Sequence, residues 1–208
     1  MKNKTKNRVL TAALILVCAV PFASAYFTDH KEVDNIFTYG NVEMTFEEPG
    51  WAEPESVLPN QTLKKDPTIT NTGNNPAFAF VEVSVPYANI TVASEDGSKA
   101  ASRKDTELFT YTVNQGWTEI GTGTKDPEAK TVTHLYVYGT SEVCTELYEE
   151  ESVTLYDSVT FVNAVEDEGL EGQTDILTNK AYVIQTTDIN GGVTTPDAVW
   201  DVLSKQSM

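Results

Sequence analysis

Cysteine is nearly absent from this chain of 208 residues. Cys18 lies within an apolar N-terminal run, which leaves Cys144 as the one cysteine in the rest of the sequence. A single cysteine cannot form an internal disulfide, so a disulfide-stapled scaffold is excluded. Cys144 has no histidine near it in sequence, and we interpret it as a small buried apolar side chain and not as a nucleophile.

Positive charge is also scarce, because 14 Lys and Arg face 31 Asp and Glu, for a formal net charge of −17. Four of the basic residues lie in the first eight positions, and no acidic residue precedes Asp29. The chain after Ala25 therefore carries 10 basic and 31 acidic residues, a net charge of −21. Such a surface repels phosphate backbones and anionic lipids, which argues against nucleic acid as a partner. It suits a soluble secreted protein or one that captures cations.

Catalytic motifs are missing as well. The sequence contains no H-E-x-x-H, no G-x-S-x-G and no phosphate loop of the form G-x-x-x-x-G-K-[ST]. A catalytic zinc needs three protein ligands and an open position, and the spacing of His30 and His134 does not supply them. We interpret His134 as a half-buried strand histidine satisfied by a neighbouring hydroxyl. No carboxylate pair for glycoside hydrolysis is singled out. We expect no catalytic residues, no metal ligands and no cofactor.

Two acidic patches, Glu149–Glu151 and Glu166–Glu168, are the candidates for binding calcium. Neither patch has the alternating oxygen-ligand spacing of an EF-hand loop, so a solvated surface is the default interpretation.

The first 25 residues have the organisation of a signal peptide. A basic segment, Met1–Arg8, precedes an apolar run, Val9–Phe22, that is short for a membrane span. Ala23 and Ala25 then supply the small-x-small pattern of a cleavage site, which places the new N-terminus at Tyr26. We expect residues 1–25 to be removed by a signal peptidase and residues 26–208 to form one secreted domain that meets the membrane only transiently. An uncleaved N-terminal anchor is the alternative.

Helical periodicity is absent before the last dozen residues, and strand patterns take its place. The chain is organised around residues 57–86. Asp66-Pro67 opens an extended run over residues 68–70, residues 71–76 favour a turn, and Ala77–Val85 resumes as a strand. In that strand the alanines and valines share one face, while Phe78 and Phe80 fall on the other. We interpret the two runs as adjacent strands whose apolar face needs a second layer.

Other segments supply further strands and one helix. Val42, Met44 and Phe46 alternate with polar residues, and residues 109–113 turn at Gln115-Gly116 into a hairpin with residues 117–120. We also expect a loop over residues 48–55 with Trp51 as a lid, a surface excursion over 89–105 and a turn over 121–130. Further strands are expected over 131–138, 152–163 and 181–187, and in the second of these Tyr156 faces away from Leu155. A helix over 198–205, capped by Thr195, follows. This pattern predicts an all-β, two-sheet sandwich, jelly-roll-like, with a short C-terminal helix.

Four blocks in order carry a family resemblance. The sequence resembles the TasA/camelysin-like exported proteins of Gram-positive bacteria, whose export uses a SipW-type signal peptidase. Residues 25–29 with 35–42 look like the family's A-x-F-x-D … F-x-x-G-x-[VL] opening, and residues 58–83 are similar to its L-x-P-G-x … N-x-G-x-x-x-x-[FY]-V-x-V stretch. Residues 155–161 and 181–185 supply the other two blocks. Asn60 departs from the family's glycine, although asparagine tolerates the positive φ that such a turn needs.

The resemblance implies a jelly-roll-like domain of the cell surface or biofilm matrix, where relatives assemble into protein fibres. Strand addition at an exposed sheet edge is the physical basis for such self-association or for binding other matrix proteins. The candidate assembly strand is Tyr26–Phe37, with Tyr26, Phe27, Ile36 and Phe37 as its apolar residues; the alternative is that it folds back as the domain's own first strand.

Two further hypotheses come from other classes of protein. The first is a surface module that binds carbohydrate or peptide through exposed aromatic residues, with Trp51, Trp117, Tyr136 and Tyr138 as candidates. The second is a metal-dependent protease, as camelysin-like members have been classed, although this sequence shows no zinc motif.

Overall fold

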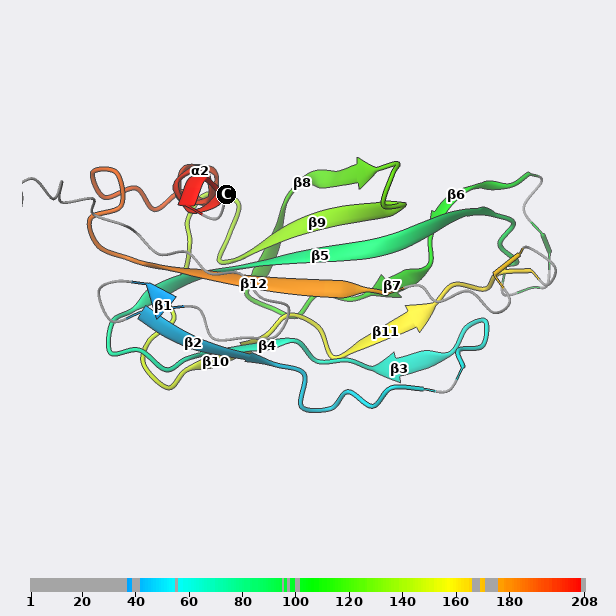
Figure 1. Cartoon of the computed structure of the whole chain (residues 1–208), viewed down its shortest axis with the longest axis horizontal. Helices are drawn as coiled ribbons and strands as arrows, with labels where there is room; N and C mark the ends of the chain where they lie inside the picture. Colours follow the sequence, from blue (N-terminus) through cyan, green and yellow to red (C-terminus); the bar gives the residue numbers. More distant parts are fainter. Residues whose placement is uncertain are drawn as a thin grey trace, which may run out of the picture.

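Strands stacked in two layers are the main elements of the computed structural model, which describes residues 37–38, 42–54, 56–94, 96, 98–99, 102–165, 169–170 and 176–206 (Figure 1). Helix α2 (Pro196–Gln206) lies against one of the layers. All pairings between the named strands are antiparallel. The all-β sandwich with a short terminal helix is confirmed, while the jelly-roll order of strands stays a prediction.

The first layer contains the strand order β1-β2-β4-β10, continued by β3-β11-β7. Their bounds are β1 (Phe37–Thr38), β2 (Val42–Glu47), β3 (Thr62–Lys64), β4 (Thr68–Asn71), β7 (Phe109–Tyr111), β10 (Ser152–Thr154) and β11 (Ser158–Phe161). β3 and β4 are two parts of one extended run, as are β10 and β11. Between the parts, Leu155 N donates to Pro67 O at 2.9 Å and Lys65 N donates to Asp157 O at 3.3 Å. The ladder is therefore interrupted in both runs at the same level.

The second layer has the strand order β12-β5-β9-β8. Its members are β5 (Ala77–Ile90), β8 (Trp117–Asp126), β9 (Thr131–Tyr138) and β12 (Thr178–Gln185), and β6 (Lys104–Glu107) pairs with the far end of β5. β5 has 14 residues and pairs with three strands, which makes it the central strand of this layer.

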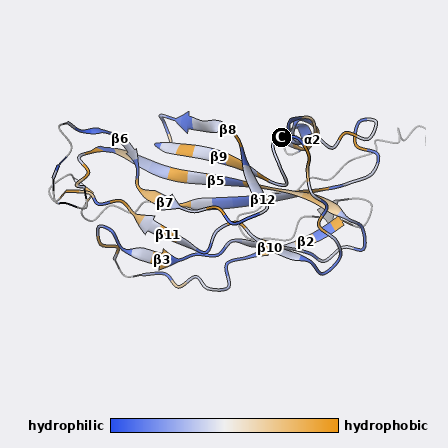
Figure 2. Ribbon diagram, turned by 180° about the vertical axis from the view of Figure 1, so that it is seen from behind, coloured by the Kyte–Doolittle hydropathy of each residue, from blue (hydrophilic) through white to orange (hydrophobic). Residues whose placement is uncertain are grey.

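Both faces of β5 are buried because its sequence alternates two kinds of apolar residue. The alanines and valines from Ala77 to Val85 pack against Val42, Met44 and Ile69 of the first layer. Phe78 and Phe80 lie in a second cluster with residues of β12 and α2, including Val199 and Leu203. Figure 2 shows the apolar bands that β5 and β9 contribute to the middle of the second layer. The sandwich is thus three layers thick where α2 covers it.

Several sequence-based boundaries are confirmed. The residues Val42, Met44 and Phe46 are buried and alternate with more exposed ones, and β9 spans the predicted residues 131–138. α2 begins at Pro196 after Thr195, whose carbonyl accepts a hydrogen bond from Val199 N at 3.0 Å. Such boundaries depend on local alternation and capping, which short segments encode.

The predicted pairing of neighbouring segments is wrong in two places. The strands on either side of residues 71–76 were expected to be adjacent, but β4 and β5 lie in different layers, and residues 71–76 form the corner between them. Likewise β7 pairs with β11 whereas β8 pairs with β9, so Gln115-Gly116 carries the chain from one layer to the other. An apolar strand must be covered by a second layer. When consecutive segments supply the two layers, each pairs with a strand from elsewhere in the chain and not with its neighbour in sequence.

Four smaller expectations also need correction. β8 continues to Asp126 through a bulge between Ile120 and Thr124, so the turn predicted for residues 121–130 is shorter. Residues 89–90 pair with residues 104–105, so the excursion predicted for residues 89–105 is shorter and begins after residue 90. Tyr156 is fully buried, because the interruption at residues 155–157 turns it inward. Trp51 is 38% exposed and lies beside Lys65, whose Nζ is 4.5 Å from its ring centroid, and does not form a lid.

Asn71 holds the corner between β4 and β5. Its side chain is fully buried; Nδ2 donates to the carbonyls of Asn75 and Leu147 at 2.9 and 2.8 Å, and Oδ1 accepts from Gly73 N at 2.9 Å. The side chain therefore adds three hydrogen bonds at the corner. Leu147 O also accepts from Ala77 N and Gly73 N also donates to Glu43 O, both at 3.0 Å, so the Asn71 amide reinforces backbone bonds that cross the corner.

We predict that Asn71→Ala lowers the free energy of unfolding by about 2 kcal/mol, because three hydrogen bonds of a buried side chain are lost while Leu147 O and Gly73 N keep their backbone partners. Urea denaturation of the purified protein measures the loss. Asn74→Ala, at an exposed position of the same corner, is the matched control and should stay within about 0.5 kcal/mol of the unchanged protein. Equal losses for the two variants would contradict the role given to Asn71.

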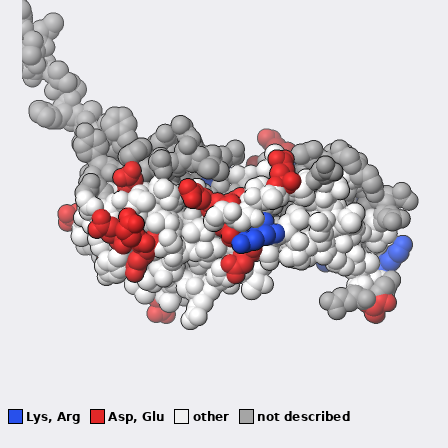
Figure 3. Space-filling view, turned by 90° about the horizontal axis from the view of Figure 1, so that it is seen from below, with Lys and Arg blue, Asp and Glu red and all other residues white. Residues whose placement is uncertain are grey.

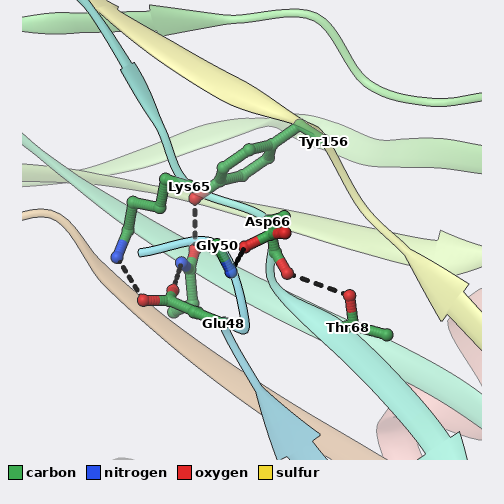
Figure 4. Close-up of polar contacts among 7 residues, drawn as sticks. Glu48, Gly50, Lys65, Asp66, Thr68 and Tyr156 are labelled. Carbon is green, nitrogen blue, oxygen red and sulfur yellow. Dashed lines mark hydrogen bonds and ion pairs between the residues drawn. The ribbon is translucent and has the colours of Figure 1, made fainter. Parts of the chain in front are cut away.

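A buried ion pair occupies the interruption of the first layer (Figure 4). Lys65 is 7% exposed, and its Nζ lies 2.6 Å from Oε2 of Glu48. The other oxygen of Glu48 accepts from Nδ2 of Asn179 on β12 at 2.7 Å, and Asn179 Oδ1 accepts from the Tyr156 hydroxyl at 2.9 Å. Asp66 beside it accepts from Gly50 N at 2.7 Å. The network joins the loop after β2, both interrupted runs and the second layer.

We predict that Lys65→Met lowers the free energy of unfolding by about 3 kcal/mol, because Glu48 then stays partly buried without its cation. Adding Glu48→Gln should recover part of that loss, and denaturation of the two single variants and the double variant measures the coupling. Lys64→Met removes an exposed lysine next to it and should change the free energy by no more than about 0.5 kcal/mol. Purely additive losses would contradict the pairing.

Candidate functional site

A hollow of about 600 Å³ opens between the two layers where β7 faces β8 and β9. The row of β9 that borders it points toward the first layer, because His134 and Tyr136 pair with Val83 and Val81, which belong to the core between the layers. The residues that line it are Thr106, Glu107, Phe109, Thr110, Tyr111, Val113, Trp117, Glu119, His134, Tyr136 and Val162. The hollow therefore combines an apolar wall with carboxylates, hydroxyls and one imidazole.

His134 lies between two carboxylates from different strands. Its Nδ1 is 2.7 Å from Glu119 Oε1 on β8, and its Nε2 is 3.0 Å from Glu107 Oε2 on β6. The His134 side chain is 16% exposed, whereas those of Glu107 and Glu119 are 35% and 37% exposed. Only the imidazolium form has two N–H groups, so only the charged ring can donate to both carboxylates at once. The expectation that a hydroxyl satisfies His134 is wrong, because charged groups take both nitrogens.

The surroundings of His134 favour its charged form. Burial acts against the charge, but the hydrogen bonds to Glu119 and Glu107 outweigh burial and raise the pKa of His134 above its ordinary 6.5. The Tyr136 ring is stacked with the imidazole at a centroid distance of 6.4 Å. These groups hold the bulged edge of β8 and the crossover from β6 to β7 against β9.

The aromatic side chains form the inner wall of the hollow. The hydroxyls of Tyr111 and Tyr136 are 3.0 Å apart, and burial raises the pKa of both, that of Tyr136 to about 12. Trp117 is 8% exposed, and its indole Nε1–H has no hydrogen-bond partner, the one such buried side-chain nitrogen or oxygen in the described part of the chain. An indole N–H usually finds an acceptor when it is buried.

The geometry differs from that of a metal centre. Glu107 and Glu119 approach opposite nitrogens of the His134 ring, so the three side chains do not surround a common point. Over the described residues, no group of three His, Cys, Asp or Glu side chains is arranged to hold a metal ion. Cys144 is buried, as expected, and burial raises the pKa of its thiol to about 12.

The two edges of the second layer are built differently. β8 carries a bulge, glycines with positive φ at residues 121 and 123, and the charged residues Glu119, Lys125 and Asp126. β12 runs regularly for eight residues with Lys180 as its single charged residue. Among the described residues no strand pairs with β12 on the side away from β5. Bulges and charges are the usual protection of a sheet edge; β8 has both, whereas β12 has no bulge and no charged residue from Ala181 to Gln185.

The predicted assembly segment lies mostly outside the described residues. Ala23 and Ala25 of the cleavage site and Tyr26, Phe27 and Ile36 of the segment are not described, nor is His30. Phe37 belongs to β1, where it pairs with Glu43 of β2. The last residue of the segment is therefore part of the chain's own first layer.

The other candidates are scattered over the molecule. Of the four aromatic residues proposed for binding, Trp117 and Tyr136 line the hollow, Tyr138 packs on Trp117, and Trp51 lies far off in the loop after β2. Glu149–Glu151 are exposed, and Glu166–Glu168 lie outside the described residues. Figure 3 shows that acidic side chains outnumber basic ones on the face it presents.

Glu107, Glu119 and Tyr111 are site residues that were not predicted from the sequence. Glu119 and His134 are separated by 15 residues and Glu107 and His134 by 27, so no motif spacing joins them. One signal was available: strand alternation places Glu119 on the same face as Trp117, and His134 on the same face as Tyr136. Charged residues on an inward row indicate a site or an opening.

No family model matches the chain, and comparisons with curated proteins and with solved structures return no match either. In the described segments, no helix has the length and apolar character needed to cross a membrane.

We predict that His134 makes stability depend on pH. Its pKa is higher in the folded than in the unfolded state, so its stabilisation is complete below about 6.5 and is lost as pH rises through the folded pKa. The unfolding free energy of the unchanged protein minus that of His134→Gln should therefore fall across that interval and then level off. Urea denaturation between pH 5.5 and 9 measures it. A difference that is constant with pH would contradict the charged pairing.

Proposed function

We propose that this protein is a secreted structural protein of the cell surface or biofilm matrix, and that it assembles into fibres by strand addition along β12. The observation that carries the proposal is the contrast between the two edges of the second layer, since β8 has a bulge and several charged residues and β12 is regular with one. The resemblance to TasA/camelysin-like exported proteins supports it, as does the signal-peptide pattern of residues 1–25.

The β12 edge offers what an added strand requires. An antiparallel strand uses alternate backbone groups for its inner partner, which leaves the remaining N–H and C=O groups directed outward. Along residues 181–184 the side chains are buried on both faces, so an added strand would meet an ordered backbone with no charged side chain between Lys180 and Gln185. Main-chain hydrogen bonds then supply affinity, and the side chains of the donor supply specificity.

The donor in this proposal is the part of Tyr26–Phe37 that precedes β1, residues 26–36 of a neighbouring molecule. Cleavage after Ala25 would free this segment, so assembly would begin only after export. The pairing of Phe37 with β2 fixes where the segment leaves its own chain, on the side of the sandwich where β2 contacts β12. The alternative, in which the whole segment folds back onto its own domain, predicts a monomer.

Electron microscopy of the mature protein that begins at Tyr26 tests the proposal. We expect filaments from this protein and monomers from a variant in which residues 26–36 are shuffled, because composition and length are kept while the side-chain pattern is lost. An excess of a peptide with the sequence of residues 26–37 should shorten the filaments by occupying the β12 edge, and the shuffled peptide should not.

Size-exclusion chromatography and near-ultraviolet circular dichroism serve as controls for folding. If the mature protein stays monomeric with a native spectrum, or if the shuffled variant also forms filaments, strand addition by this segment is wrong. None of the contacts of the described residues favours the third hypothesis, a metal-dependent protease.

A further inference from the structure

We propose that the hollow beside β7, β8 and β9 binds a lysine or arginine side chain of a partner peptide. The positive charge of that side chain would pair with whichever of Glu107 and Glu119 receives no hydrogen bond from a neutral His134. This is a second function of the chain, independent of assembly along β12. It gives the binding-module hypothesis one site and one class of ligand.

The charge of the hollow requires a cation. Two carboxylates, Glu107 and Glu119, face a single imidazole, and there is no Lys or Arg among the described residues that line the hollow. The nearby Lys125 is engaged elsewhere, with Asp105 and over the ring of Tyr87. Charged His134 leaves one negative charge without a partner in the hollow, and neutral His134 leaves two. Because more than a third of each glutamate side chain is exposed, a ligand can reach them.

The walls of the hollow suit a basic side chain better than a sugar. A sugar stacks on an exposed aromatic face, but Trp117 and Tyr136 are only 8% and 5% exposed. Phe109, Val113 and Val162 offer apolar surface of modest size beside the carboxylates. Lysine and arginine combine an aliphatic stem with a charged head, so the stem would lie on this wall and the head at the glutamates.

The unpartnered indole of Trp117 points to a peptide and not to a free amine. Trp117 lines the hollow, its buried N–H has no hydrogen-bond partner among the described residues, and both lining carboxylates belong to the His134 cluster. A backbone carbonyl next to the bound basic residue is an acceptor of the right kind. The ligand would therefore contribute one cation and one carbonyl at the same site.

Protons and ligand compete in this arrangement. The groups that face His134 are Glu107 from β6, Glu119 from β8 and Tyr136 from β9, with Tyr111 of β7 behind Tyr136, while Val83 of β5 is uncharged. When His134 loses its proton it keeps one N–H and can donate to one carboxylate only. The other is then free to accept the ligand. By linkage, ligand binding must also make His134 easier to deprotonate.

Titration of the mature chain with the peptide acetyl-Gly-Lys-Gly-amide tests the proposal, with acetyl-Gly-norleucine-Gly-amide as the uncharged probe of matched shape. Calorimetry and NMR at pH 5.5, 7 and 8.5 should show binding of the lysine peptide that strengthens by up to about tenfold per pH unit below the pKa of His134. The norleucine peptide should not bind. The NMR titration midpoint of His134 should move to lower pH when the lysine peptide is present.

Variants locate the site. Glu107→Gln and Glu119→Gln should each weaken binding at least fivefold, and His134→Gln should make binding independent of pH over this range. Glu128→Gln, in the exposed turn after β8, removes the same charge away from the hollow and should bind as the unchanged protein does. Circular dichroism checks that each variant is folded, and loss of binding counts only in folded variants.

Three results would overturn the proposal. They are equal binding of both peptides, unchanged binding by Glu107→Gln and Glu119→Gln, and binding of a neutral oligosaccharide such as maltotetraose with no dependence on pH. None of them bears on filament formation, so failure here and failure of the assembly proposal can be told apart.

Discussion

The pair of Lys65 and Glu48 is the interaction on which the arrangement of the two layers depends. Apolar burial between the layers is large but non-directional, and it does not by itself fix how one layer lies over the other. The ion pair does so, because Glu48 also binds Asn179 of β12, and Asn179 binds Tyr156 between β10 and β11. Charges in such a place are tolerated only when their remaining donors and acceptors are satisfied. Both runs of the first layer interrupt their ladder here, and Tyr156 fills the opening with its hydroxyl directed at the network.

The sequence predicted the features of the fold that depend on residues close together in the chain, and it did not predict those that depend on distant residues. Alternation in residues 42–47 and 131–138, the proline before β4 and the cap before α2 are local, and they located these elements correctly. Pairing is not local. Thr110 of β7 pairs with Thr160 of β11, and no sequence pattern within either strand identifies the other as its partner. The sequence suggested a hairpin at Gln115-Gly116 because a turn signal joins two strands there, but a turn signal does not say whether the chain stays in its layer.

The site was harder to predict than the fold for the same reason. His134 was visible as an isolated histidine in a strand, yet its chemistry comes from Glu107 and Glu119, which the topology brings from two other strands. A hydroxyl partner was the ordinary interpretation of such a histidine. It failed because β8 projects its inward row beyond the well-packed core, where charged side chains remain accessible. The inward position of Glu119 in the alternation of β8 is the one local sign of this arrangement.

The position of β12 in the chain has a consequence for the order of folding. β5 pairs with β12 across about a hundred residues of sequence, and α2, which covers the other face of β5, follows later still. Long-range pairings of this kind form slowly, because loop closure must precede the contacts that stabilise it. Until residues 176–206 arrive, β5 is a long apolar strand with one edge unpaired and one face uncovered. The rate at which this last part of the chain docks therefore sets how long the central strand stays open to capture by another molecule.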